Sequence, residues 1–134
     1  MYGFARPATG DTFTVILPRV RVEHMADAPA GFAAHADPDG TKVLVLVVDN
    51  AGWHTATRLV VPANVRLHVL PACTPQLHPV EALWPLVREA VANRSIGRID
   101  RLRAILRERL AYLDRNPNVV QPRVGFRWAR SLEQ

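Results

Sequence analysis

Six consecutive apolar residues at positions 43–48 lead directly into an aspartate, Asp49. The run is VLVLVV, and its four valines are β-branched. It is far too short to span a bilayer. A continuous, β-branched apolar run is typical of a strand buried on both faces, as in parallel sheets covered by helices. Because ligands gather at the carboxyl ends of such strands, Asp49 is a candidate functional residue.

The residues before this strand predict a hairpin and a helix. Residues 2–7 and 12–18 flank the sequence ATGD, which predicts two short strands joined by a turn. Residues 22–36 are weakly helical, and Pro29 and Gly31 interrupt the pattern. The sequence DPDG at 37–40 predicts a turn before the apolar strand.

The residues after Asp49 alternate between helix and strand patterns. We expect a short helix at 55–60, a strand at 65–70 and a proline-braced loop up to Pro79, which suits the first turn of a helix. Pro85 should kink or shorten that helix. Its core-facing stripe is Val80, Leu83, Trp84, Val87 and Val91.

A last helix is predicted over about residues 98–113, with an irregular tail at about 116–134 anchored by Phe126 and Trp128. The apolar stripe of that helix is Ile99, Leu102, Leu106, Leu110 and Leu113. Its arginines lie mainly off the stripe, and two interpretations stay open for them: a solvated face, or a surface for DNA.

The composition is that of one globular domain over residues 1–134. The pattern contains neither a signal peptide nor a membrane span, and the single cysteine, Cys73, fits a cytoplasmic protein. The net charge is +5, with Lys42 the only lysine among 17 basic residues. This balance favours a polyanionic partner such as nucleic acid. The equally weighted alternative is a compositional bias towards alanine, valine, arginine and proline.

Two carboxylates stand at the edges of the apolar segments. Asp49 ends a strand, and Glu81 opens the helix that follows the next strand, so the two can meet over one sheet edge to hold a hard cation such as Mg²⁺. The alternative is local, because Asp49 can cap a turn and Glu81 can complement a helix dipole. Spacing alone favours the local interpretation.

Two longer motifs resemble those of the DDE superfamily transposases, specifically the insertion-sequence transposases related to mariner elements. Residues 49–54, Asp-Asn-Ala-Gly-Trp-His, are similar to the family's Asp-Asn-Ala-x-x-His. Residues 70–84, LPACTPQLHPVEALW, are similar to LPPYSPELNPxExLW. Between Asp49 and Glu81 lie 31 residues, positions 50–80, close to the family's usual gap. The resemblance extends over the chain from Tyr2 onward.

The chain departs from the family pattern in three places. His78 stands where Asn or Gln is common and Cys73 where Tyr is frequent, and both are interpreted as peripheral to metal binding. The family's first acid lies on a strand before the hairpin, and this chain begins after it. Asp11 and Asp37 lie on other elements and do not replace it, so we expect an incomplete acidic triad.

The resemblance implies an RNase H-like α/β fold, a mixed sheet flanked by helices, here N-terminally truncated and missing the first central strand. It implies metal-dependent DNA strand cleavage and transfer with Mg²⁺ or Mn²⁺, in which Asp49 and Glu81 are catalytic metal ligands. Asn50 and His54 would contact DNA or support Asp49, and a core role for His54 is equally open.

We therefore expect residues 1–134 to form a partial DDE endonuclease domain that binds DNA without sequence preference and is inactive alone. Its expected protein partners are a second copy or an intact transposase. The alternative function is a non-catalytic remnant that binds DNA or a transposase as a dimerisation partner or inhibitor.

Overall fold

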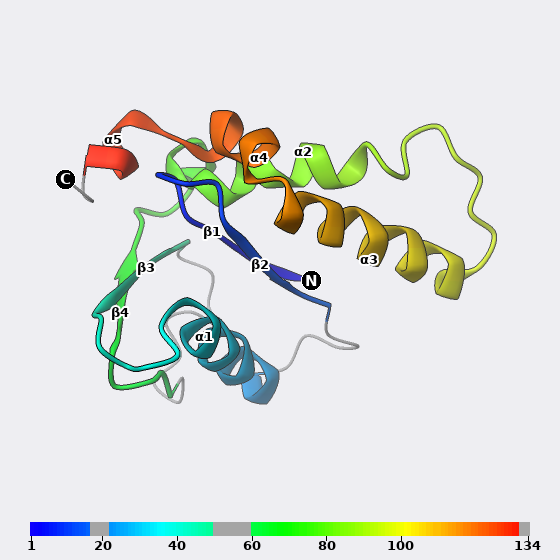
Figure 1. Ribbon diagram of the computed structural model, residues 1–134. Helices are drawn as coiled ribbons and strands as arrows, with labels where there is room; N and C mark the ends of the chain where they lie inside the picture. Colours follow the sequence, from blue (N-terminus) through cyan, green and yellow to red (C-terminus); the bar gives the residue numbers. More distant parts are fainter. Residues whose placement is uncertain (17–21, 50–59, 132–134) are drawn as a thin grey trace. The chain divides into compact units, whose positions relative to one another are not determined.

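The computed structural model describes residues 1–16, 22–49 and 60–131 of the chain (Figure 1). It is a mixed α/β structure in which two pairs of strands are accompanied by helices. The chain divides into two compact units, one of residues 1–2 and 15–78 and the other of residues 3–14 and 79–134. The expectation of one domain over residues 1–134 stays a prediction.

The first unit contains the helix α1 (Val22–Ala36) and the strands β3 (Leu44–Val48) and β4 (Val65–Val69). The predicted helix, turn and two strands are confirmed at nearly the expected bounds. The strands pair in parallel, in a register that runs from Leu44 opposite Val65 to Val48 opposite Val69. The parallel pairing expected from the apolar run is therefore confirmed. The helix predicted at 55–60 lies outside the described residues, apart from Val60.

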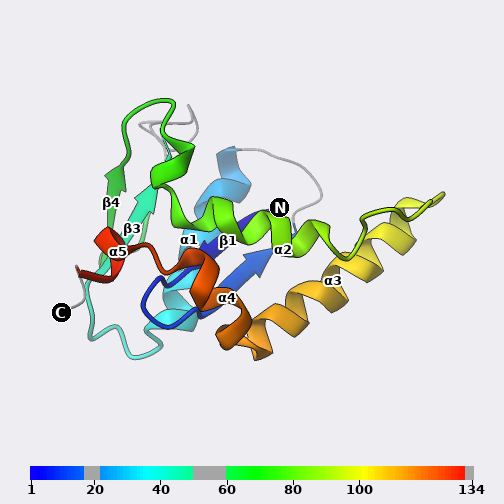
Figure 2. The same cartoon turned by 90° about the horizontal axis from the view of Figure 1, so that it is seen from above.

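The expectation that β3 is buried on both faces is wrong. Leu46 and Val48 are 8% and 9% exposed, whereas Val45, on the opposite face, is 62% exposed. Within the described part of this unit, α1 lies beside β3 in both views (Figures 1 and 2). Successive side chains of a strand point to opposite faces, so a cover on one face buries only alternate residues.

Asp37 joins the end of α1 to the start of the parallel sheet. Its carboxylate accepts hydrogen bonds from the backbone N–H groups of Thr41 (3.1 Å) and Lys42 (2.9 Å), and from Nδ2 of Asn64 (3.0 Å). The Lys42 N–H is the main reason that the pKa of Asp37 lies below its ordinary value, against the opposite effect of burial. Asp37 is thus a structural brace that holds the 37–42 turn against the residue before β4.

The second unit is built on the hairpin turn and the C-terminal helices. The strands β1 (Tyr2–Ala5) and β2 (Thr12–Val15) pair as predicted, though they are shorter than expected. Gly10 in the turn has φ +84°, a conformation that favours glycine. A Cβ at Gly10 would lie 2.4 Å from the carbonyl oxygen of Pro117, so the turn and that residue are in close contact.

The helix predicted from Pro79 begins as a 3₁₀ turn, η2 (Pro79–Ala82), and continues as α2 (Leu83–Arg88). Pro85 is the third residue of α2, where its missing N–H has no partner to lose. The predicted shortening is therefore confirmed. Leu83 and Val87 of the predicted stripe are 0% and 2% exposed.

The long helix α3 (Ile99–Arg115) lies beside α2 and is joined to it by residues 89–98 (Figures 1 and 2). Its predicted stripe is buried only in the second half of the helix. Leu110 and Leu113 are 6% and 1% exposed, but Ile99 is 60% exposed. The burial of such a stripe depends on how far the neighbouring helices extend along it.

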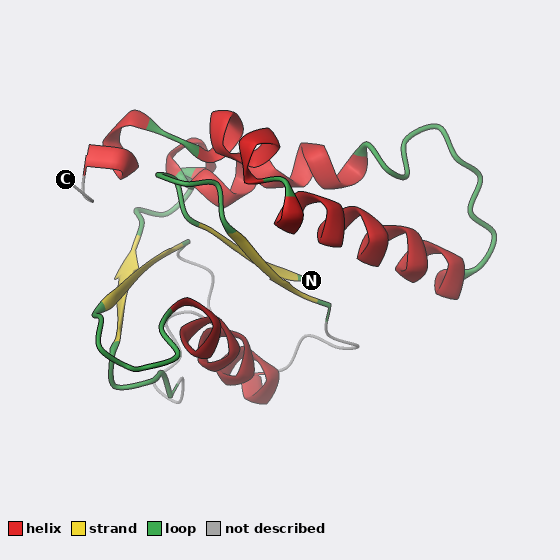
Figure 3. Cartoon of the chain, in the orientation of Figure 1, coloured by secondary structure: helices red, strands yellow, loops and turns green. Residues whose placement is uncertain are grey.

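The tail is not irregular as expected, because α4 (Pro117–Val124) and α5 (Arg127–Arg130) cover most of it (Figure 3). Pro117 takes the first position of α4, where proline is well suited. Val120 and Val124, one turn apart, are both fully buried. Their burial outweighs the one helical hydrogen bond that Pro122 removes. Of the helices that the structure describes, none is long and apolar enough to cross a membrane.

Candidate functional site

Asp49 follows the last residue of β3, at the carboxyl end of the parallel pair. The N–H of Leu70 donates to the carbonyl oxygen of Val48 at 2.8 Å. Backbone hydrogen bonds therefore fix β3 as far as Val48, the residue before the acid. The Asp49 side chain is half-buried. The predicted position of this acid, at the end of a parallel strand, is therefore confirmed.

Glu81 lies in the 3₁₀ turn η2 and its side chain is exposed. In the part of the chain that the structure describes, its carboxylate has no hydrogen-bond or ion-pair partner that would compete with a metal ion. Asp49 belongs to the first compact unit and Glu81 to the second. Their approach to one another therefore stays a prediction.

The loop between β4 and η2 is braced by its own hydrogen bonds. Oγ1 of Thr74 donates to the carbonyl oxygen of Pro71 at 2.6 Å. The backbone N–H of Leu77 donates to the carbonyl oxygen of Thr74 at 3.0 Å. Cys73 is exposed and has φ +58°, which is uncommon for a residue with a side chain. The loop that leads to Glu81 is thus held in one shape by local contacts.

His78 ends this loop and links it to β3. Its Nε2 lies 3.2 Å from the carbonyl oxygen of Val47, two residues before Asp49. The sequence interpretation treated His78 as a peripheral departure from the family motif. The sequence did carry a signal that His78 could matter to the site, because it stands three residues before Glu81 and directly before a proline. Only the fold shows what the ring contacts.

The remaining predicted site residues, Asn50 and His54, lie outside the described residues. Among the residues that the structure does describe, no group of three or more histidine, cysteine, aspartate or glutamate side chains could hold a metal ion. The donors present at the two motifs are carboxylate oxygens, which suit Mg²⁺ and Mn²⁺.

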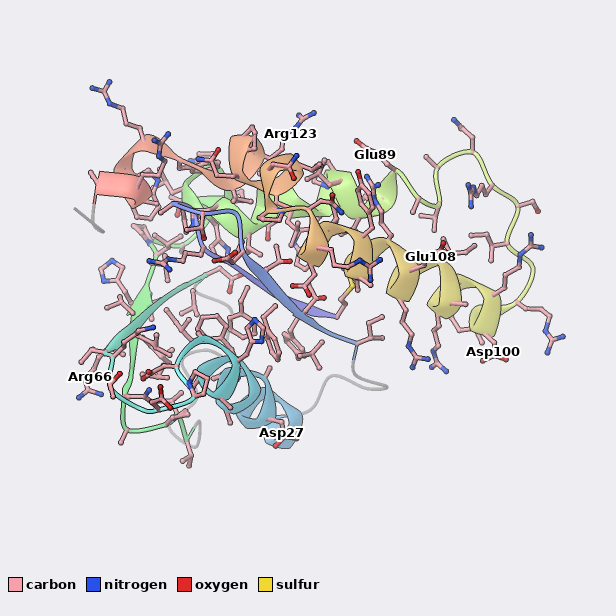
Figure 4. All side chains as sticks on the ribbon, in the orientation of Figure 1. Asp27, Arg66, Glu89, Asp100, Glu108 and Arg123 are labelled. Carbon is pink, nitrogen blue, oxygen red and sulfur yellow. The ribbon has the colours of Figure 1, made fainter. Side chains whose placement is uncertain are left out.

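Exposed arginines are numerous on the C-terminal helices and their connections. One of the less exposed ones, Arg109, donates from Nε to the carbonyl oxygen of Leu86 at 2.8 Å and from Nη2 to the Glu89 carboxylate at 2.7 Å. Glu89, Asp100 and Glu108 place negative charge on the same helices, and Arg123 adds positive charge from α4 (Figure 4). The exposed arginines of residues 79–131 are Arg88, Arg94, Arg98, Arg101, Arg103, Arg107, Arg115, Arg123, Arg127 and Arg130.

Comparison with known families gives a match to the DDE superfamily endonucleases over residues 1–103. The chain belongs to the DDE superfamily endonucleases. It is also similar to the uncharacterized protein y4pE/y4sA of Sinorhizobium fredii (strain NBRC 101917 / NGR234), at 36% identity over 89 residues, which are 66% of this chain. The match spans 64% of that protein's length. No solved structure matches the chain.

The extent of the DDE family match bears on the site. Residues 1–103 include β3, β4, η2 and therefore both Asp49 and Glu81. The helices α4 and α5 lie after the matched residues. The DDE endonuclease family generally uses a divalent metal ion, and the role of the two acids in this chain stays a prediction.

Proposed function

We propose that this DDE endonuclease domain belongs to a mariner-related insertion-sequence transposase and takes part in metal-dependent DNA strand cleavage and transfer. The observation that carries the proposal is the position of Asp49 at the carboxyl end of a parallel strand, within the family match that also contains Glu81. The order of hairpin, helix and parallel strand pair supports an RNase H-like fold with these two acids at its site.

The chemistry of the donors fits a hard divalent cation. Asp49 and Glu81 would hold Mg²⁺ or Mn²⁺ through carboxylate oxygens. Bound metal ions activate the attacking hydroxyl and stabilise the leaving oxygen of a phosphodiester. The chain's own contribution is to hold one carboxylate at the end of a hydrogen-bonded strand and to present the other from a braced turn.

The arginines of the C-terminal helices would contact DNA phosphates. Phosphate contacts supply binding energy without sequence preference, and they weaken as salt rises because counterions are released. Acids lie among these arginines on the same stretch of chain, and we propose contacts to the DNA backbone at several points and no reading of base sequence. A protein that acts on bacterial DNA in this way would work in the cytoplasm.

Two carboxylates alone make an incomplete set for two-metal chemistry, which the family resemblance assigns to three acids. We propose that residues 1–134 bind a divalent ion weakly and do not cut DNA unaided. A second copy or an intact transposase is the proposed source of the complete site.

The test combines metal binding with strand nicking. Mn²⁺ binding should weaken about tenfold or more in Asp49→Asn and in Glu81→Gln, because each removes an ionised oxygen ligand. Asp39→Asn, which changes an exposed turn carboxylate, is the matched control and should bind Mn²⁺ as the parent does. Equal binding by all four proteins would refute the assignment of the ligands.

The nicking assay follows supercoiled plasmid incubated with the 134-residue chain and Mn²⁺. We expect no nicked product from this chain. Metal-dependent nicking that is lost in Asp49→Asn would contradict the incomplete set and show that two acids suffice. DNA binding without Mn²⁺ binding would favour the alternative function, a non-catalytic binding remnant.

A further inference from the structure

His78 is held at three points, although the family comparison gives it no role. Its backbone N–H donates to the carbonyl oxygen of Pro75 at 3.0 Å. Its φ and ψ are −98° and 105°, in the extended region to which Pro79 restricts the residue before it. Its ring reaches the carbonyl oxygen of Val47 at 3.2 Å. Both the main chain and the side chain of this residue are therefore fixed.

The carbonyl that His78 contacts lies on the edge of β3 that faces away from β4. In a parallel pair, the N–H and C=O of one residue point to the same neighbour, and those of the next residue point the other way. Leu44 donates to Asn64, and Val48 accepts from Leu70, so residues of even number point to β4. The carbonyl of Val47 points to the opposite edge, where His78 meets it.

The hydrogen bond determines which ring nitrogen carries the proton. A carbonyl oxygen only accepts, so Nε2 of His78 must be the donor. Its Nδ1 is buried and has no hydrogen-bond partner among the described residues. The contact to Val47 is therefore the one polar interaction that the described surroundings offer this ring.

The two ends of this bond lie close in sequence to the two acids. Val47 precedes Asp49 by two residues, and His78 precedes Glu81 by three. Fixing His78 on the edge of β3 therefore holds the end of the loop beside the residues that lead to Asp49.

We propose that His78 is a positioning residue: its Nε2–H, donated to the Val47 carbonyl, holds the end of the 70–78 loop on the edge of β3 and steadies the carboxyl end of the strand, where Asp49 would bind its metal ion. This inference rests on the proposed metal site. Its mechanical part, the restraint between the strand and the 70–78 loop, is measurable without any metal.

Three variants separate this role from simple packing. His78→Phe keeps a ring of similar size but removes the donor, and His78→Gln places an amide N–H near the position of Nε2. His68→Gln, at an exposed position on β4, is the matched control. A packing role predicts that Phe is tolerated better than Gln, whereas a positioning role predicts the reverse.

The first measurement is the distance distribution between spin labels on the two sides of the bond. The labels are attached at Val43→Cys on the strand side and Gln76→Cys on the loop side, both exposed positions of the first unit, in a Cys73→Ser background without metal. We expect a narrow distribution in the parent, in His78→Gln and in the His68→Gln control, and a clearly broader one in His78→Phe. An unchanged distribution in His78→Phe, or one as broad in His78→Gln, would overturn the proposal.

The second measurement is Mn²⁺ affinity. His78→Phe should bind Mn²⁺ about fivefold more weakly, as expected for the loss of one hydrogen bond that orders the site, and His78→Gln should stay within about twofold of the parent. If the parent itself binds no Mn²⁺, the proposed metal site fails, while the label distances still decide the role of His78.

A third measurement needs no variant and so does not depend on whether His78→Phe folds. A long-range proton–nitrogen NMR spectrum of the parent, at a pH where the ring is neutral, reports the tautomer directly. We expect the proton on Nε2. A neutral ring protonated on Nδ1 would show that the bond to Val47 is absent and would overturn the proposal.

Discussion

The contact between the hairpin turn and α4 gives a sharp test of the second unit's packing. Gly10 has φ +84°, and an added Cβ would lie 2.4 Å from the carbonyl oxygen of Pro117 and 2.7 Å from the backbone nitrogen of Gln121. Those atoms belong to the backbone, so they cannot move aside as a flexible side chain would. The substitution Gly10→Ala therefore combines backbone strain with a steric clash.

The magnitude follows from two costs. A left-handed conformation costs a residue with a side chain about 1–2 kcal/mol, and forcing one extra carbon into a packed contact costs about 1–3 kcal/mol. Alanine also restricts the unfolded chain, which offsets about 0.4–1 kcal/mol of that loss. We expect Gly10→Ala to lower the free energy of unfolding by about 3 kcal/mol.

Two other glycines separate these contributions. Gly40 has φ +64° with nothing within 4 Å of an added Cβ, so Gly40→Ala carries the strain alone. Its expected cost is about 1 kcal/mol. Gly97 has open space and no positive φ, so Gly97→Ala should be neutral or slightly stabilising. Because all three variants share the effect on the unfolded chain, their differences isolate strain and clash.

The assay is urea unfolding at neutral pH, followed by far-ultraviolet circular dichroism and tryptophan fluorescence. If the two compact units unfold in separate transitions, each variant is compared with the parent in its own unit. The reasoning is refuted if Gly10→Ala costs no more than Gly40→Ala, because the turn would then have no close contact with Pro117.

Two further predictions concern the cores of the units. Leu83 is 0% exposed, so Leu83→Ala should lower the free energy of unfolding by about 3 kcal/mol by leaving a cavity in the second unit. Leu77→Ala, at a position 38% exposed, should lower it far less. Equal urea midpoints for the two variants would contradict this. Asp37→Asn should destabilise the first unit because an amide group cannot accept from all the donors around it. The pKa of Asp37 is lowered in the folded state, so its stabilising effect is complete above about pH 4 and is lost as pH falls through the lower folded pKa. The difference between parent and Asp37→Asn should shrink from pH 7 to pH 3 in urea titrations, and a constant difference would contradict the role of the charge.

Local patterns sufficed to predict most of the described secondary structure. The hairpin around Gly10, the turn at 37–40 and the strands β3 and β4 depend on short-range turn chemistry and on side-chain shape, which the sequence carries directly. The parallel pairing was also predictable, because a continuous valine and leucine run is rare outside such sheets. The position of Asp49 at a strand end follows from the same pattern.

The tail was expected to be irregular, yet α4 and α5 form in it. Pro117 and Pro122 suggest an interrupted chain, but the first of them begins α4 and the second costs one hydrogen bond. The gain from burying Val120 and Val124 depends on neighbours distant in sequence, so it could not be read from the tail itself.

The sequence by itself determined the family and the two candidate acids, because motif order and spacing are properties of the chain. Only the tertiary structure decided which apolar residues are covered. Val45 and Ile99 belong to convincing apolar patterns, yet they are 62% and 60% exposed. Periodicity states which side chains share a face, but a face is buried only where another element lies against it. The same holds for His78, whose hydrogen bond to Val47 joins residues 31 positions apart and exists only because the folded chain brings the loop to the edge of β3.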